Sequence, residues 1–276
     1  MMSHLQLKFW GVRGSTPTPR SDRLAFGGNT PCIEFRVTGE DAVLVIDGGT
    51  GIIGLGDSLK QEVGDRPLSV YVLLTHFHWD HIQGLPFFAP LYDSKNRFHF
   101  HSERPAATIE EILEGQMSRP YFPVPFERVA AQREFVDTRD QEIRVGDLRI
   151  RSFPINHPQG ACGYRLEANG AVVVHVSDHE HGDARIDAGI REQAQGADVL
   201  IYDAQYTPEE YAVKRGWGHS TYTEATRVAR ACGVRQLVLF HHDPGHDDES
   251  LRAIVAAARQ DFENTEAAQE GSTIRL

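Results

Sequence analysis

The spacing of apolar residues predicts strands in both halves of the chain. Residues 5–9 and 32–37 alternate apolar and polar side chains, which is typical of strands with one buried face. Residues 42–46 and 70–74 are continuous apolar runs, typical of strands that are buried on both faces, and residues 171–176 show a similar buried-strand pattern. Further strands are expected at 97–101, 142–145, 148–155, 161–168, 198–202 and 236–240.

Helices are expected between these strands. Pro105 stands at the first turn of a helix that reaches Gly115, and Thr221 and Glu224 have the spacing of a capping box at the start of another. The remaining expected helices cover 52–60, 184–195 and 248–262. No linker interrupts the pattern, so residues 1–276 are expected to form one domain whose polar tail from about residue 264 is frayed.

The composition limits which partners and which cellular compartment are expected. The 276 residues carry a formal charge of −11, which is a poor match for a long polyanion held by many phosphate contacts. We therefore expect no long nucleic acid as a partner. The three cysteines, Cys32, Cys162 and Cys232, show no CxxC spacing, which favours a reducing compartment. No run approaches the ~20 apolar residues of a membrane span, so we expect a cytoplasmic protein with no membrane partner.

The segment from Thr75 to His81 concentrates the candidate chemistry. It reads Thr-His-Phe-His-Trp-Asp-His and directly follows the apolar run 70–74. Residues two apart in an extended segment point to the same side, so His76 and His78 can grip one divalent ion. Asp80 and His81 follow after the chain has begun to turn and can reach a second ion. Two ions ~3.5–4 Å apart are a known hydrolytic arrangement, so the segment predicts a metal centre.

This pattern resembles the signature of the metallo-β-lactamase superfamily. The resemblance implies an α+β fold, a four-layer αββα sandwich of two mixed sheets flanked by helices, with one or two metal ions at one edge. His157, Asp178 and His241 each follow an expected strand, and they match in order the later ligand positions of that superfamily.

The resemblance therefore implies a complete ligand set for two ions. The first ion is assigned His76, His78 and His157, the second Asp80, His81 and His241, and Asp178 bridges them. A bridging water or hydroxide would be the nucleophile. Zinc is the expected ion, although manganese or iron accepts the same ligands.

Some neighbouring residues leave alternatives open. His242 adjoins His241 and could be the ligand in its place; we prefer His241 because the superfamily pattern that the sequence resembles places its ligand directly after the strand. Asp47 also ends a strand. It is interpreted either as an acceptor that orients a ligand histidine or as a plain turn residue before Gly48.

Other stretches resemble a narrower group, the bacterial members related to tRNase Z and to phosphodiesterases. They are residues 9–17, 26–32, 47–51, 217–221 and 240–244. In that group a histidine in a comparable Gly-His-Ser-Thr segment assists the leaving group. The resemblance therefore implies that His219 is catalytic, and Asp80 is the second predicted catalytic residue. Arg13, Asn29 and His242 are the predicted substrate contacts.

The resulting hypothesis is a two-metal phosphodiesterase acting on a small phosphodiester, such as a cyclic nucleotide or short oligonucleotide. The alternative is a hydrolase of a carbon ester, thioester, lactone or β-lactam on the same metals. The sequence leaves the assembly open, with a homodimer as the commonest state.

Overall fold

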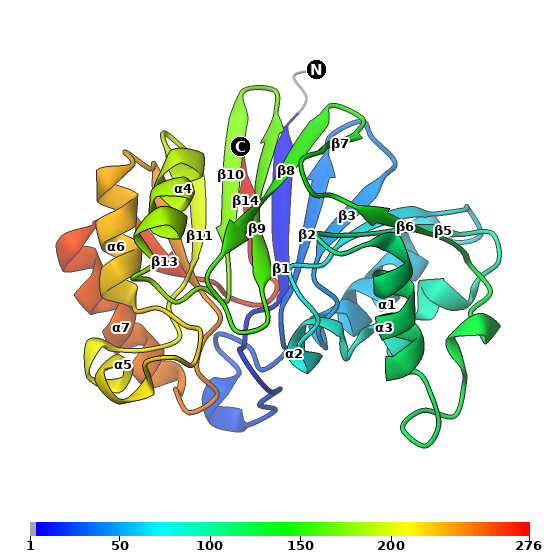
Figure 1. The fold of residues 1–276 in the computed structure, drawn as a ribbon, viewed down its shortest axis with the longest axis horizontal. Coiled ribbons are helices and arrows are strands. Elements are labelled where there is room, and N and C mark those ends of the chain that lie inside the picture. The colour runs from blue at the N-terminus through cyan, green and yellow to red at the C-terminus, as the bar shows by residue number, and fades with distance from the viewer. Residues whose placement is uncertain (1–3) are drawn as a thin grey trace.

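Two seven-stranded sheets pack face to face in the computed structural model, which describes residues 4–276, and helices cover both outer faces (Figure 1). This is the αββα sandwich expected from the sequence. In sheet order, the first sheet contains β14 (Thr273–Arg275), β1 (Leu5–Gly11), β2 (Cys32–Val37), β3 (Val43–Ile46), β4 (Ser69–Leu73), β5 (Arg97–Ser102) and β6 (Gln132–Asp137). The second contains β13 (Thr265–Ala267), β12 (Gln236–Phe240), β11 (Val199–Asp203), β10 (Ala171–Val176), β9 (Ala161–Ala168), β8 (Leu148–Ile155) and β7 (Glu142–Val145).

The helices divide between the two outer faces. The first sheet is covered by α1 (Gly51–Val63) and α3 (Ala106–Gln116), on the right in Figure 1. The second is covered on the left by α4 (Ala184–Ala194), α6 (Tyr222–Ala231) and α7 (Asp248–Asp261), with α5 (Pro208–Lys214) below them. Short turns of helix are α2 (Trp79–Ile82), η1 (Ser21–Arg23), η2 (Leu85–Phe87), η3 (Ala89–Tyr92) and η4 (Phe126–Arg128).

The continuous apolar strands form because each is buried on both sides. In β3, Leu44 and Ile46 face the core between the sheets, whereas Val43 and Val45 pack under α1. Alternate side chains of one strand thus enter two different cores. The alternating strand β1 buries Leu5, Leu7 and Phe9 between the sheets and leaves the intervening side chains partly exposed.

The two sheets repeat one scheme, which determines where a site can lie. Strands β3, β4, β5 and β6 run parallel, and so do β10, β11, β12 and β13, while the other pairs are antiparallel. In open α/β sheets, ligands bind outside the carboxyl ends of such parallel strands. The segment after β4 and the residues after β10 and β12 lie at these ends.

The predicted frayed tail is wrong. Thr265–Ala267 pairs in parallel with β12, and Thr273–Arg275 pairs with β1, so the C-terminal segment contributes one strand to each sheet. The expectation failed because three-residue strands carry almost no periodic signal; their stability comes from the sheet edge they join.

Two other elements differ from expectation. Strand β6 and helix α5 were not predicted. The complete capping box belongs to α5, where Thr207 and Glu210 each accept a backbone N–H. At α6, Thr221 accepts the N–H of Glu224 as predicted, but the Glu224 carboxylate binds Arg227 instead of the helix start.

The described residues contain no helix that is long and apolar enough to cross a membrane. Cys32, Cys162 and Cys232 are free thiols, and all three are buried. The predicted compartment stays a prediction.

Candidate metal centre

The predicted ligands converge at one edge of the sandwich from strands that are far apart in sequence. The segment Thr75–His81 follows β4, and His157, Asp178 and His241 follow β8, β10 and β12. Their ring nitrogens and carboxylate oxygens form two compact groups, in each of which the atoms lie within 4.8 Å of one another.

The backbone is held in the left-handed region at three residues that stand just after strands β3, β10 and β12. Asp47, Asp178 and His241 have φ values of 62°, 58° and 62°. Such a conformation is uncommon for residues other than glycine and persists where the surroundings over-determine it, often at functional sites. All three side chains lie in or against the ligand clusters: Asp178 and His241 belong to one of them, and Asp47 contacts His81.

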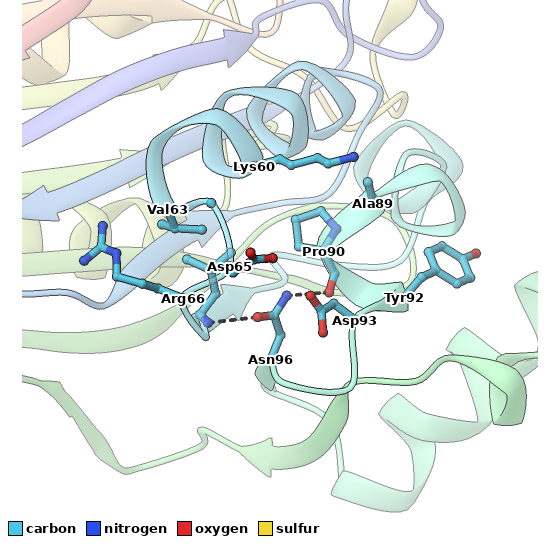
Figure 2. A pocket seen from close by; sticks show the side chains of 11 residues that line it. Lys60, Val63, Asp65, Arg66, Ala89, Pro90, Tyr92, Asp93 and Asn96 are labelled. Carbon is cyan, nitrogen blue, oxygen red and sulfur yellow. Dashed lines mark hydrogen bonds between the residues drawn. The ribbon is translucent and has the colours of Figure 1, made fainter.

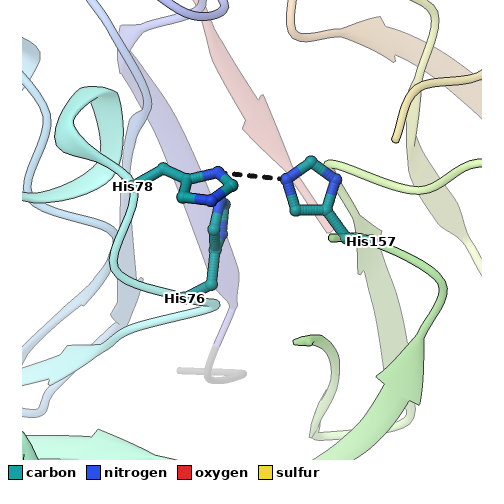
Figure 3. Close-up of side chains that lie close together, drawn as sticks. All are labelled: His76, His78 and His157. Atoms are coloured by element: carbon teal, nitrogen blue, oxygen red, sulfur yellow. Dashed lines mark hydrogen bonds between the residues drawn. The ribbon is translucent and has the colours of Figure 1, made fainter. Parts of the chain in front are cut away.

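His76, His78 and His157 form the first group (Figure 3). His78 Nδ1 and His157 Nε2 lie 3.1 Å apart. The other nitrogen of His157 donates to the carbonyl of Gly218 at 2.8 Å, and that of His78 donates to Gln159 Oε1 at 3.0 Å. In neutral rings both facing nitrogens therefore carry lone pairs, and a cation between them removes their repulsion.

Asp80, His81, Asp178 and His241 form the second group. His81 Nε2 lies 3.2 Å from oxygens of Asp80 and Asp178, and His241 Nε2 lies 3.2 Å from oxygens of the same two carboxylates. Ligand atoms bonded to zinc at ~2.0–2.1 Å in tetrahedral geometry lie ~3.3 Å apart. The spacing of this group matches that value.

Asp178 lies between the two groups. Its Oδ1 is 3.2 Å from His241 Nε2 in the second group, and 3.9 Å from the Nε2 atoms of His76 and His157 in the first. It is thus the side chain placed to contact a cation in each group, which is the bridging role expected from the sequence.

Each ligand histidine is oriented through its other ring nitrogen. His81 Nδ1 donates to Asp47 Oδ2 at 2.8 Å, and His241 Nδ1 donates to Gln205 Oε1 at 2.7 Å. Asp47 also accepts the hydroxyl of Thr75, whose oxygen lies 3.0 Å from His76 Nδ1. Such contacts fix the tautomer that presents a lone pair to a metal. Of the two interpretations of Asp47, the structure thus favours an acceptor that orients a ligand histidine over a plain turn residue.

The residues present fit divalent cations. The buried Nε2 atoms of His76 and His81 have no hydrogen-bond partner within the described chain, although both point into carboxylate-bearing clusters. Burial lowers the pKa of His157 to about 4, so its ring is neutral at pH 7 and has a lone pair to give. Buried nitrogen lone pairs against ionised carboxylates are the donor set that zinc and related ions bind.

His219 lies beside the bridge and is held by Asp203, a residue that the sequence prediction missed. His219 Nδ1 donates to Asp203 Oδ2 at 2.9 Å, and the ring stacks on His241 with centroids 4.9 Å apart. Burial lowers the pKa of His219, but the charge and hydrogen bond of Asp203, together with the charges of Asp178 and Asp80, outweigh burial and raise it. Asp203 is the last residue of β11 and lies at the same sheet edge as Asp178, so its position at the end of a strand was the available signal.

The three predicted substrate contacts are wrong. Arg13 is fully buried and donates to the carbonyls of Gly27, Asp243 and His246. The amide of Asn29 donates to Glu270.

His242 is also turned away from the site. Its Nε2 lies 2.9 Å from the carbonyl oxygen of Ala268, and the ring is buried. The structure therefore selects His241, and not His242, as the side chain that reaches the cluster.

Arg13 is expected to act on stability. In Arg13→Ala, three carbonyls lose a buried charged donor, so the free energy of unfolding should fall by ~3 kcal/mol. Urea unfolding measures this, with exposed Arg20→Ala as the control that changes it little. An unchanged stability with a raised KM would restore the substrate role.

The glycine loop before Arg20 supports the centre through its backbone. Ser15 N donates to Asp80 Oδ2 at 2.8 Å. A Cβ on Gly14 would lie 2.5 Å from His241 Nδ1 and 2.7 Å from Gln205 Oε1. Any larger residue at position 14 would clash with the His241 ring, which explains the glycine there.

Gly14→Ala is accordingly expected to displace the His241 ring and lower kcat/KM by roughly 10- to 100-fold, the effect typical of disturbing the support of a metal ligand. Steady-state kinetics with metal analysis measures it. Gly115→Ala is the control, because a Cβ there meets open space. Wild-type activity in Gly14→Ala would show that the close contact is not required.

Comparison with known proteins places this geometry in a family. Residues 43–242 match the model of the beta-lactamase superfamily domain, and the chain belongs to that family. It is 27% identical to a Ribonuclease Z of Methanopyrus kandleri, over 100% of this chain and 99% of the relative.

Two solved structures show the same fold. The metallo-beta-lactamase fold protein YhfI of Bacillus subtilis superposes with a TM-score of 0.73 at 20% identity, over 99% of this chain and 100% of that protein. The short form of human tRNase Z gives 0.64 at 16% identity, with 98% of each chain covered. These two likenesses show the fold. The superfamily match and the relatives named Ribonuclease Z identify the chain as a metal-dependent hydrolase of the phosphodiesterase type.

These relatives overturn one expectation. The net charge of −11 led us to expect no long nucleic acid as a partner, yet full-length relatives bear the name Ribonuclease Z. The prediction is wrong because net charge averages the whole surface, whereas divalent cations supply positive charge at the site itself.

Proposed function

We propose that this chain hydrolyses phosphodiester bonds in nucleotide-containing substrates, RNA among them. The observation that carries the proposal is the position of Asp178. It lies between two ligand groups and within 4.0 Å of His219, so a phosphate at the bridge would meet both metal sites and a histidine. The name of the full-length relatives supports a nucleic-acid phosphodiester.

When bound, two divalent cations supply charge that stabilises phosphoryl oxygens and makes water acidic enough to give a nucleophile at neutral pH. The protein holds the ligands for them. Asp47, Gln205 and the carbonyl of Gly218 fix the rings of His81, His241 and His157, so each ring is held in one orientation before a cation binds.

His219 is positioned to assist the leaving group. Asp203 binds its Nδ1, which leaves Nε2 as the nitrogen that can donate a proton to a departing alkoxide. The Asp203 carboxylate also stabilises the protonated ring, in the manner of the aspartate of a catalytic triad. Asp203 is itself fixed by the N–H groups of Asp178 and Ser220.

A substrate panel tests the proposal. Metal-loaded protein is expected to hydrolyse bis(p-nitrophenyl) phosphate and a short oligoribonucleotide, and to leave nitrocefin and a lactone unchanged. Asp80→Ala should be inactive throughout, because it removes an oxygen that contacts both His81 and His241. Turnover of the lactam or lactone without phosphodiester hydrolysis would overturn the proposal. Cyclic nucleotides and a precursor RNA are added to the panel to show which size of substrate the protein prefers.

A further inference from the structure

A cavity of about 280 Å³ opens beside the first ligand group and has no role in the account above. Its lining includes His76, His78, Arg104, Thr108, Ile112 and Gln159. The cavity therefore shares two walls with the metal centre, so a substrate whose phosphate lies at the centre can extend into it.

Another cavity, of about 240 Å³, lies at the amino-terminal end of β4, and Figure 2 shows the residues that line it. Arg66 and Leu68 precede β4, whereas the ligands follow it. Its surroundings contain no candidate ligand histidine. It is remote from the chemistry and offers a place for control variants.

Arg104 lines the first cavity and is connected through Gln159 to His78, one of the candidate metal ligands. Its Nη2 donates to the backbone carbonyl of Gln159, and the side chain of Gln159 accepts from His78 Nε2 at 3.0 Å. Gln159 itself has a φ of 66°, a left-handed conformation that shapes the loop after β8. The guanidinium is thus fixed at a defined place relative to His78.

The charge of Arg104 is not neutralised locally. No carboxylate of residues 4–276 lies within ion-pair distance of its guanidinium. The adjacent Glu103 lines a different cavity together with Arg139. In a chain of net charge −11, a fixed guanidinium that lines a cavity beside the metal ligands favours an anionic part of the substrate.

We propose that this cavity is a subsite for a second phosphate, next to the phosphodiester that is cut, with Arg104 as its recognition residue. The inference rests on the proposed phosphodiesterase activity. Ile112 and Phe77 give the cavity an apolar wall for the sugar or base that joins the two phosphates, and the Thr108 hydroxyl adds a hydrogen-bonding group. Guanidinium binds phosphate through paired, charge-assisted hydrogen bonds.

The second phosphate can be a terminal monoester or an internal phosphate of a longer chain. The probes are therefore a plain diribonucleotide, the same dinucleotide with a 5′-phosphate, the same with a 3′-phosphate, and a trinucleotide. We expect one of the phosphorylated forms, or the trinucleotide, to exceed the plain dinucleotide in kcat/KM by roughly 10- to 100-fold, the value of a charged hydrogen bond. The form that gains shows on which side of the scissile bond the subsite lies.

Arg104→Gln is expected to remove this preference, and Arg104→Lys to keep part of it because the charge remains. Arg66→Gln is the matched control and should keep the full preference. Metal content is measured for each variant, since a merely structural defect would lower all substrates together and leave their ratio unchanged.

The outcomes separate the two proposals. If no phosphodiester is hydrolysed, the proposed function fails. If all probes are hydrolysed at similar rates, or if Arg104→Gln keeps the wild-type ratio, the subsite is refuted while the phosphodiesterase activity stands.

Discussion

Asp178→Asn is expected to lower phosphodiester hydrolysis by at least ~1000-fold and to reduce the metal content of the protein. Asp178 contacts donor atoms of both ligand groups, so the loss of its charge affects both cation sites. Asparagine is the informative replacement because it has the same shape and tolerates the φ of 58° found here. A change of fold therefore does not account for the loss.

Steady-state kinetics and elemental analysis measure this effect. Asp147→Ala, at an exposed turn, is the control and should behave as the wild type. An Asp178→Asn protein that keeps two metal equivalents and activity within tenfold of wild type would contradict the bridging position.

His219→Ala is expected to lower kcat on RNA by ~100- to 10,000-fold, the usual contribution of a general acid, while the metal content is retained. The size of the effect should depend on the leaving group. p-Nitrophenolate departs without a proton, so bis(p-nitrophenyl) phosphate should lose much less activity than a substrate with an alkoxide leaving group. This difference distinguishes proton donation from a metal-binding role.

His99→Ala is the matched histidine control, since that ring pairs with Glu134 away from the centre. If His219→Ala slowed both substrates equally and lost metal, the ring would be acting as a ligand. Equal activity of the variant and the wild type would end any catalytic role.

The strands and most of the site were predictable because both have local signals. A largely apolar run such as Val43–Ile46 indicates a strand buried on both faces, and a histidine or aspartate within two residues after such a run indicates a position at the sheet edge. His76, Asp178 and His241 all carry this signal. Asp203 carries it as well, and it was missed because it stands outside the spacing of the motif.

The remaining errors come from partners that are distant in sequence. Arg13 resembles a phosphate-binding residue of a glycine loop until its acceptors, at Asp243 and His246, are known. Asn29 depends in the same way on Glu270. A local pattern gives the type of each side chain but not which carbonyl or carboxylate the fold brings to it.

A pair of cations joined by Asp178 is proposed to carry the activity, and metal titration of the chelated protein tests this pair most directly. Zinc or manganese is added to apoprotein while bound metal and hydrolysis of bis(p-nitrophenyl) phosphate are measured on one sample. We expect no activity in the apoprotein and full activity only near two equivalents of metal per chain. Full activity without metal, or saturation at one equivalent with a second never bound, would contradict this proposal.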